Sequence, residues 1–282
     1  PTSCTSTTKK CRPLSDSLLT LISTPYIWAM NLDLSGKTAV VCGSTQGIGF
    51  ATATELANMG ARVFLVSRNQ QALEEAKSKL PTPQHQEHGI LVADFQHPET
   101  LESSLDQFLK DHTAQILVNN TGGPPAGNAI DAHVDEFRIA FNQHLICNHI
   151  LATKLVPGMK AGGYGRIINV ISTSVKQPLA NLGVSNTIRG AVANWSKTLA
   201  NELGVFGITV NNVLPGATAT ARLDAIISKK VETTGKDYDE LLQGMANQVP
   251  MKRVAQPEEI GNAIAFLASP AAAYINGINL PV

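Results

Sequence analysis

The feature that most constrains the fold is a regular alternation, from Thr38 onward, of short apolar runs with longer amphipathic stretches. The apolar runs are rich in β-branched residues and predict strands, whereas the longer stretches are typical of helices. This alternation favours a parallel sheet whose right-handed crossovers place helices on both faces. We therefore predict a single α/β domain with a doubly wound parallel sheet, the Rossmann fold. The predicted strands are 38–42, 62–67, 89–94, 115–120, 166–172 and 208–216, and the longest helical stretches are 99–112, 134–160 and 183–205.

Residues 1–29 differ in composition from this pattern and are left out of the predicted domain, which comprises residues 30–282. The segment is rich in Ser and Thr, and its basic residues outnumber its single acid, Asp16. Three interpretations stay open: upstream sequence outside the functional protein, with Met30 as the natural start; an organelle transit peptide; or a disordered extension. We expect a cytoplasmic protein, with organelle import through this segment as the alternative.

Charge and composition argue against several classes of function. Lys and Arg together number 22, as do Asp and Glu, so the formal net charge is zero and no basic block follows a phosphate backbone. No apolar run approaches the roughly 18–20 residues that cross a bilayer. The four cysteines are far apart, and the histidine pairs 85/88 and 144/149 lack further ligands or the spacing of metal pairs. We therefore expect no nucleic acid, membrane or metal among the partners.

A glycine-rich turn, CGSTQGIGF (42–50), joins the first predicted strand to the first predicted helix. Its glycines let the backbone turn sharply and approach a pyrophosphate closely. The helix N-terminus behind them presents free N–H groups and the positive end of its dipole. Between a strand and a helix, this spacing predicts a dinucleotide site rather than a plain turn. The predicted contacts in the turn are Gly43, Ser44, Thr45, Gln46, Gly47, Ile48 and Gly49.

The end of the second predicted strand indicates which dinucleotide binds. A carboxylate there would bind the ribose 2′-hydroxyl of NAD, but the strand ends in Ser67 and Arg68. Arg68 offers a planar fork to a 2′-phosphate, and no acid is present to repel that phosphate. We predict NADP as the cofactor, with NAD as the alternative; the competing interpretation is that Arg68 is merely solvated.

Together these motifs resemble the short-chain dehydrogenase/reductase family over about residues 32–282. The resemblance implies an NAD(P)-dependent oxidoreductase acting on a small carbonyl or alcohol substrate, similar to β-ketoacyl carrier-protein reductases, and a homodimer or homotetramer. The motifs that carry it, in order, are GSTQGIG (43–49), NNTGG (119–123), NVIS (169–172), NNVLPGATAT (211–220) and PMKRVAQPEEIGNAIAFLAS (250–269). The further cofactor contacts that it implies are Asp94, Phe95, Asn120, Thr121, Gly122, Arg189, Pro215, Gly216 and Thr220.

The chain departs from the family pattern at the positions that carry the chemistry. The family uses a Ser to polarise the carbonyl, a Tyr thirteen residues later to exchange the proton, a Lys four residues beyond the Tyr, and an Asn on the preceding helix. The corresponding residues here are Ser172, Ser185, Arg189 and His144. None of the four tyrosines is followed by a Lys at the fourth position, so no shifted alignment restores the Tyr–Lys pair.

These replacements leave the proton donor open. Ser185 is a far weaker acid than a phenol, and Arg189 stays protonated, so Arg189 can replace the ribose-binding part of the Lys role but not the proton relay. An ordinary imidazole pKa of about 6.5 suits proton exchange, and we hypothesise that His144 supplies the proton through water and Ser185. The alternative is a histidine packed between helices. Two functions stay open: a hydride-transferring enzyme, or a non-catalytic dinucleotide-binding protein that acts as a sensor or partner subunit.

Overall fold

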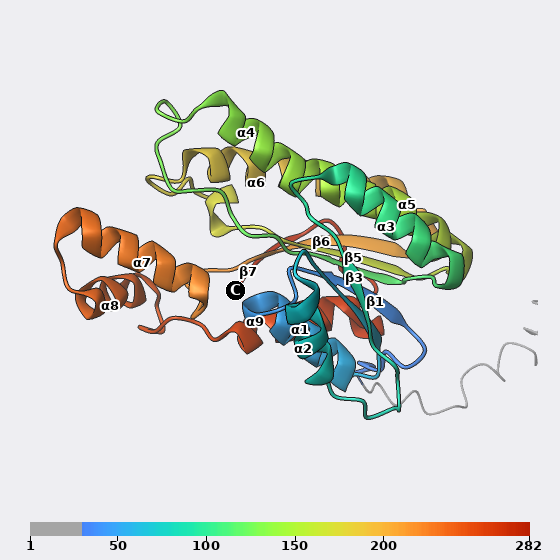
Figure 1. Ribbon diagram of the computed structural model, residues 1–282. Helices are drawn as coiled ribbons and strands as arrows, with labels where there is room; N and C mark the ends of the chain where they lie inside the picture. Colours follow the sequence, from blue (N-terminus) through green and yellow to red (C-terminus); the bar gives the residue numbers. More distant parts are fainter. Residues whose placement is uncertain (1–29) are drawn as a thin grey trace, which may run out of the picture. The chain divides into compact units, whose positions relative to one another are not determined.

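The computed structural model describes residues 30–282, so the three interpretations of residues 1–29 lie outside the described residues. Within 30–282, parallel strands form one sheet in the order β3-β2-β1-β4-β5-β6-β7 (Figure 1). The order reverses between β1 and β4, as in a doubly wound fold, which confirms the predicted architecture. The strands are β1 (Thr38–Cys42), β2 (Arg62–Ser67), β3 (Gly89–Val92), β4 (Ile116–Asn119), β5 (Gly165–Val170), β6 (Ile208–Leu214) and β7 (Asn279–Pro281).

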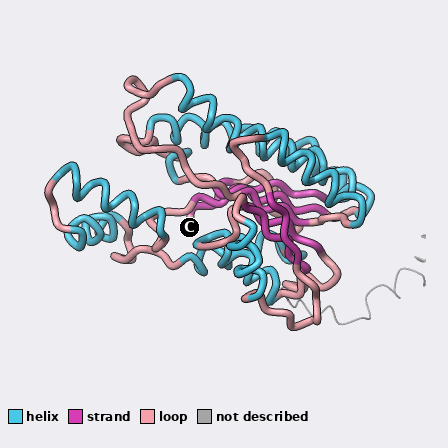
Figure 2. Tube along the Cα trace, in the orientation of Figure 1, coloured by secondary structure: helices cyan, strands magenta, loops and turns pink. Residues whose placement is uncertain are grey.

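Helices cover both faces of the sheet (Figure 2). Those between the strands agree closely with the predicted amphipathic stretches. Of the helices in residues 30–282, none combines the length and the apolar character needed to cross a bilayer. The helices are α1 (Gly47–Asn58), α2 (Gln70–Ser78), α3 (Pro98–Asp111), α4 (Val134–Phe141), α5 (Cys147–Gly162), α6 (Gly183–Leu203), α7 (Ala221–Thr234), α8 (Tyr238–Gln248) and α9 (Pro257–Ala268).

Some strand boundaries differ from the prediction. β3, β5 and β6 each end two residues before the predicted boundary, and β7 was not predicted because its three residues lie between a glycine and the last valine. After β3, the Asp94 carboxylate accepts a hydrogen bond from the Gln96 N–H and turns the chain out of the sheet. The residues that leave the strands early are therefore loop residues at the carboxyl edge, where sheets of this kind bind ligands.

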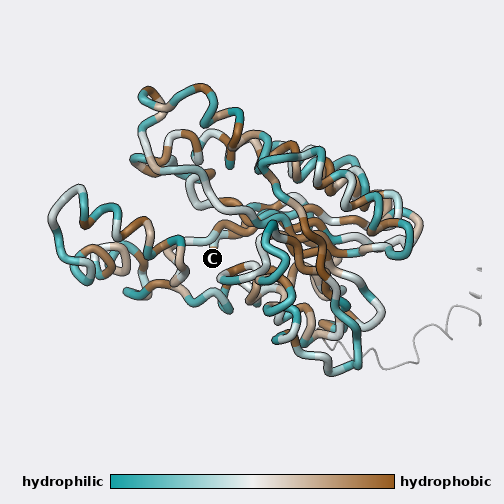
Figure 3. Tube along the Cα trace, viewed as in Figure 1, coloured by the Kyte–Doolittle hydropathy of each residue, from teal (hydrophilic) through white to brown (hydrophobic). Residues whose placement is uncertain are grey.

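Alternate residues of the central strands face two separate apolar cores, one on each side of the sheet. Ala39 and Val41 of β1 belong to the core formed with α1, α2 and α9, whereas Val40 and Cys42 belong to the core formed with α3, α5 and α6. All four residues are fully buried. Figure 3 shows the apolar residues concentrated in the strands. Strands buried on both faces have continuous apolar sequences, which is why the sheet could be predicted.

A row of asparagine amides, buried in β4, β5 and β6 and half-buried in β7, crosses four strands on the side of the sheet that carries α6. Asn119, Asn169, Asn212 and Asn279 lie at paired positions of β4, β5, β6 and β7. Each side-chain amide donates to the next, over 2.8, 3.1 and 2.7 Å. Ser196 of α6 accepts a hydrogen bond from Asn169 and donates one to Asn212. A slip of one strand by one residue would break this row, so it specifies the pairing register.

The long helix predicted over 134–160 is present, but a π-helical turn, Asn142–Ile146, separates α4 from α5. The Cys147 N–H donates to the Asn142 carbonyl, five residues back instead of the four of an α-helix. Single π-helical turns inside helices are rare and are frequently found at functional sites. The turn contains His144, which is 1% exposed.

The region that follows β6 forms a helical pair, α7 and α8, which lies apart from the helices that cover the sheet (Figure 1). Thr220 Oγ1 caps α7 by accepting a hydrogen bond from the Leu223 N–H. Gly235 ends the helix in the left-handed conformation, with φ of 69°. The Tyr238 hydroxyl of α8 donates to the Asp224 carboxylate of α7 over 2.7 Å and joins the two helices.

Candidate active site

The glycine-rich turn lies at the carboxyl edge of β1, beside the point where the strand order reverses. α1 begins at Gly47, and its N-cap residue, Gln46, makes no side-chain cap hydrogen bond. The first N–H groups of α1 are therefore available to a ligand, and the helix dipole favours negative charge there. The geometry fits the diphosphate of a dinucleotide, the group for which this turn was predicted.

Two glycines of the turn allow close backbone approaches. A Cβ atom on Gly43, whose φ is 57°, would lie 2.6 Å from the Asn120 carbonyl oxygen, and a Cβ atom on Gly49 would overlap the Gly43 carbonyl oxygen. The Asn120 side-chain amide donates to that same Gly43 carbonyl over 3.2 Å. Ser44 Oγ is buried and accepts from the Val66 N–H over 3.0 Å. The ends of β2 and β4 thus hold the turn in place, with Ser44 and Asn120 as its supports.

The residues predicted to select the cofactor lie at the end of β2. Ser67 is half-buried, and its Oγ accepts a hydrogen bond from the Asn69 N–H over 3.4 Å. Arg68 is exposed, and its guanidinium has no carboxylate partner among residues 30–282. An exposed, uncompensated guanidinium at this position fits the 2′-phosphate of NADP. Thr45 and Ile48, in the turn itself, are half-buried and can be reached by a ligand.

Residues from β3 and β6 complete the edge. Asp94 is half-buried, and within residues 30–282 only one of its carboxylate oxygens is used, by the Gln96 N–H. Phe95, next to it, packs against the core formed with α3, α5 and α6. The Thr220 methyl group would lie 3.3 Å from a Cβ atom on Gly47. The structure therefore brings the start of α7 directly against the start of α1, as the predicted contacts of 215–220 require.

Ser172 follows β5 at the same edge, and Ser185 lies in the first turn of α6. Both are half-buried. Ser172 Oγ accepts a hydrogen bond from the Ser174 N–H over 3.1 Å, which leaves the hydroxyl proton free to be donated. A bridge between Gly127 and Leu182 fixes the start of α6 against the loop that follows β4.

Arg189 of α6 lies under this edge and is 8% exposed. Its Nη1 donates to the Val170 carbonyl over 2.9 Å, and its Nη2 to the Thr121 carbonyl over 3.4 Å. The guanidinium therefore joins the ends of β5 and β4. Burial, and then the nearby Arg222 charge, lower the pKa of Arg189 to about 10, so it stays positive at neutral pH.

The Arg189 guanidinium lies close enough to His144 to affect its pKa. Burial, followed by the Arg189 charge, lowers the pKa of His144 to about 2, and a hydrogen bond with the Gly122 backbone acts in the opposite direction. Its buried Nε2 has no hydrogen-bond partner among the described residues. The ordinary imidazole pKa assumed in the sequence hypothesis is therefore wrong at this position, because the ring is desolvated beside a positive charge. His144 is neutral at physiological pH.

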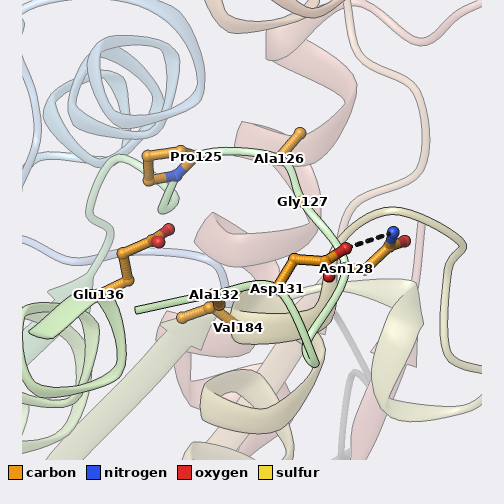
Figure 4. Close-up of a pocket in the computed structure, with 8 residues that line it drawn as sticks. All are labelled: Pro125, Ala126, Gly127, Asn128, Asp131, Ala132, Glu136 and Val184. Atoms are coloured by element: carbon orange, nitrogen blue, oxygen red, sulfur yellow. Dashed lines mark hydrogen bonds between the residues drawn. The ribbon is translucent and has the colours of Figure 1, made fainter. Parts of the chain in front are cut away.

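A pocket of about 180 Å³ adjoins the start of α6 and is lined by the loop after β4, by Glu136 of α4 and by Val184 (Figure 4). The Asn128 amide donates to the Asp131 carboxylate over 3.0 Å, and the His133 N–H donates to Glu136 over 3.0 Å. Both acids that line this pocket are thus engaged in their own loop and helix cap. Among residues 30–282, no three His, Cys, Asp or Glu side chains gather as a metal site would require.

Comparison with known proteins agrees with this geometry. A family described as enoyl-(acyl carrier protein) reductase matches residues 43–282. The 3-oxoacyl-[acyl-carrier-protein] reductase FabG of Rickettsia bellii is 32% identical over 89% of this chain and 97% of its own, and the NADPH-dependent reductase BacG of Bacillus subtilis is 29% identical over 86% and 95%. The structure of L-sorbose reductase from Gluconobacter frateurii, complexed with NADPH and L-sorbose, is 33% identical, with a TM-score of 0.84 over 90% of this chain and 97% of that one.

This chain therefore belongs to the short-chain dehydrogenase/reductase family. The family predicted from the motifs is confirmed, and so is the prediction of an enzyme that acts on CH–OH or C=O groups. The structure brings the predicted residues of the turn, of β2 and of 215–220 to one edge of the sheet. It brings Arg189 and His144 together beneath that edge. Their individual roles stay predictions.

Reasoning from sequence missed the row of asparagine amides and Arg222. The amide row carries a signal in retrospect, since each of its asparagines lies at or near the end of an apolar run. Arg222 stands among the mixed charges of 221–250, where nothing in the sequence singles it out. In the structure its Nη2 donates to the Pro124 carbonyl over 2.7 Å, so it spans from α7 to the loop after β4.

Proposed function

We propose that this protein is an NADP(H)-dependent oxidoreductase that transfers hydride between the nicotinamide and a carbonyl or alcohol, with a proton donor other than the family's tyrosine. The observation that carries the proposal is the convergence of the uncapped start of α1, the exposed Arg68 and Ser172 on one edge of the sheet. The L-sorbose reductase complex with NADPH, at 33% identity, and the NADPH-dependent reductase YwfH, at 29%, support this choice of cofactor.

We assign the cofactor-binding roles as follows. The N–H groups at the start of α1 hold the diphosphate, and Arg68 holds the 2′-phosphate. The free carboxylate oxygen of Asp94 accepts from the adenine. We also assign Arg189 a contact with the ribose hydroxyls, as the family resemblance implies. The residues that complete the contact surface are Ser67, Phe95, Thr121, Gly122, Pro215, Gly216 and Thr220.

Ser172 acts on the substrate oxygen. The bound nicotinamide supplies or accepts the hydride. The Ser172 hydroxyl, whose own oxygen already accepts from Ser174, donates to the substrate oxygen and stabilises the negative charge that develops there during reduction. Arg189, held by two backbone carbonyls, adds a fixed positive charge beneath the same edge.

The proton comes from solvent in this proposal. A neutral His144 is a hydrogen-bond acceptor at Nε2, so it orients a water molecule instead of acting as an acid. The Ser185 hydroxyl then gives its proton to the substrate oxygen and takes one from that water, and the resulting hydroxide is neutralised by a proton from bulk solvent. This replaces the hypothesis in which His144 itself supplies the proton.

The test combines equilibrium titrations of NADPH and NADH with NADPH oxidation against ketones, diketones and β-ketoacyl thioesters. We expect NADPH to bind more tightly than NADH and at least one carbonyl class to be reduced. Tight NADPH binding without turnover across the panel would favour the non-catalytic alternative. No affinity for either nucleotide would refute the proposal altogether.

We extend the proposal to a homodimer or homotetramer that pairs through α4 and α6. Ile139 and Phe141 of α4 are 52% and 40% exposed. Phe141 lines a surface groove together with Thr187 and Ile188 of α6. Exposed apolar side chains on α4, beside a groove that α6 completes, suit an interface between copies. Sedimentation of the parent and of Phe141→Glu tests this, and a monomeric parent would contradict it.

A further inference from the structure

Two guanidinium groups converge on one backbone position at the candidate active site. A Cβ atom on Gly123 would lie 3.4 Å from Nη2 of Arg222 and 3.9 Å from Nη2 of Arg189. Arg222 comes from the first turn of α7, and Arg189 from α6. Both side chains contact the loop after β4, Arg189 at the Thr121 carbonyl and Arg222 at the Pro124 carbonyl, at the edge that carries Ser172.

Neither guanidinium forms an ion pair with a carboxylate within residues 30–282. In the described part of the chain, Arg189 donates only to the Val170 and Thr121 carbonyls, and Arg222 only to the Pro124 carbonyl. Asp224, two residues after Arg222 in α7, accepts from Tyr238 instead. The acids that line the pocket after Pro124 are also engaged elsewhere, as described above.

This arrangement is unfavourable without an anion. Burial of a guanidinium costs free energy unless the charge is compensated, and a second positive charge nearby adds repulsion. Both effects act on Arg189, since burial and then Arg222 lower its pKa. An anion between the two groups would relieve both costs, and guanidinium forks are suited to carboxylate and phosphate oxygens.

We propose that Arg189 and Arg222 form a site for an anionic group, a carboxylate or a phosphate ester, carried by the carbonyl substrate itself. The site rests on the proposed function, because it lies at the edge where Ser172 meets the substrate oxygen. The diphosphate of the cofactor is the other source of negative charge, but the uncapped start of α1 provides for it. The enzyme therefore prefers oxo acids or phosphorylated carbonyl compounds over neutral ketones.

The experiment is calorimetric titration of the NADP⁺-saturated protein with matched charged and neutral compounds. The carboxylate arm uses 2-oxobutanoate, acetoacetate and levulinate against their methyl esters, and the phosphate arm uses dihydroxyacetone phosphate against dihydroxyacetone. We expect at least one anion to bind about tenfold or more tightly than its neutral partner, as a charge-assisted hydrogen bond supports. Arg222→Met should abolish this preference with unchanged NADP⁺ affinity, and Arg222→Lys should retain part of it.

Lys229→Met, at an exposed position of the same helix, is the matched control and should keep the preference. Equal binding of anions and neutral partners by the parent would overturn the proposal, as would a preference that survives in Arg222→Met. Weakened NADP⁺ binding in Arg222→Met with an unchanged preference would assign the pair to the cofactor and also overturn it. An anion preference in a protein that reduces no carbonyl would support the site while contradicting the proposed function.

Discussion

The proposed nucleotide-binding part of the site is formed by backbone groups, whereas the part beneath the substrate is formed by side chains. Around the diphosphate position the backbone makes the site: the N–H groups of α1, the carbonyl of Gly43 and the close approach of Gly49. Beneath Ser172 the side chains of Arg189 and His144 make it. A backbone site tolerates few substitutions, whereas a side-chain site can change its chemistry within an unchanged fold. This difference agrees with our prediction that the chain keeps the family's glycine-rich turn while Ser185 and Arg189 stand at the positions of its Tyr and Lys.

The positively charged side chains of the two parts also differ in their exposure to solvent. Arg68 is exposed at the end of β2, so water screens it and a phosphate can reach it at little cost. Arg189 is buried and is held by carbonyl oxygens, so its charge acts at short range on whatever enters the site. In the proposed function, the first arrangement selects the cofactor and the second acts on the reacting groups.

The largest expected effect tests the substrate side. Ser172→Ala removes the hydroxyl that we propose to stabilise the developing charge on the substrate oxygen, so kcat should fall by about 10²–10³-fold, while NADPH affinity stays at the parental value. Steady-state kinetics and an NADPH titration measure the two quantities. Ser172→Thr keeps the hydroxyl and should recover much of the rate. A parental kcat in Ser172→Ala would show that Ser172 does not act on the substrate oxygen.

The next effect tests the backbone side. A Cβ atom in Gly49→Ala would overlap the Gly43 carbonyl oxygen and displace the turn. We expect NADPH affinity to fall by roughly 100-fold, which corresponds to about 2.8 kcal/mol. Gly162→Ala is the control, because a Cβ atom there meets nothing within 4 Å. Fluorescence titration of NADPH gives the affinities, and equal values for the two variants would contradict a cradle made by backbone contacts.

A smaller effect tests cofactor selection. Arg68→Glu replaces the fork for the 2′-phosphate with a like charge, so the ratio of NADPH to NADH affinity should fall by about 10–100-fold. Lys110→Glu makes the same change of charge at an exposed position of α3 and should leave the ratio unchanged. Competitive titration of both nucleotides gives the ratio. An unchanged ratio in Arg68→Glu would mean that the guanidinium is merely solvated.

The smallest effect concerns stability. The pKa of His144 is about 2 in the folded protein and 6.5 as its ordinary value, so the unfolded chain takes up the proton first as the pH falls. Stability is therefore present above about pH 6.5 and is lost below it, by about 1.4 kcal/mol per pH unit. His144→Asn should remove this part of the loss between pH 7.5 and 5.5 in urea unfolding. His149→Asn, at an exposed position, is the control; identical pH slopes for the parent and His144→Asn would contradict burial of a neutral ring.

The fold was predictable because its signals are local. The run TAVVC predicts β1 with the observed bounds, and the glycines that follow predict the turn before α1. Strand ends were predicted less well, since apolar residues such as Val213 and loop residues such as Pro215 follow one another without a break in the pattern. The π-helical turn around His144 was not predicted. One extra residue in a single turn does not visibly change the helical pattern of apolar residues over 134–160.

The location of a site residue could be predicted where it depends on the residue's position along the chain. It could not be predicted where it depends on which distant segment a side chain contacts. Ser172 and Arg68 could be placed at the carboxyl edge because Arg68 directly follows β2 and Ser172 follows β5 after one residue; their roles stay predictions. The burial of His144 could not, because it depends on how closely α6 packs against the long helix. Arg222 could not be identified either, because its contact with Pro124 spans segments about a hundred residues apart and depends on where α7 lies.

The amide row has a consequence for how the site assembles. Asn119, Asn169 and Asn212 stand just ahead of the loops that carry Asn120, Ser172 and residues 215–220. A misaligned strand would leave buried amides without partners, at about 1–3 kcal/mol for each group. Such a chain would lose stability before it could present misplaced loops. The asparagine row therefore disfavours misaligned strands and so keeps the loops of the reactive edge in position. We assign none of these asparagines a contact with substrate.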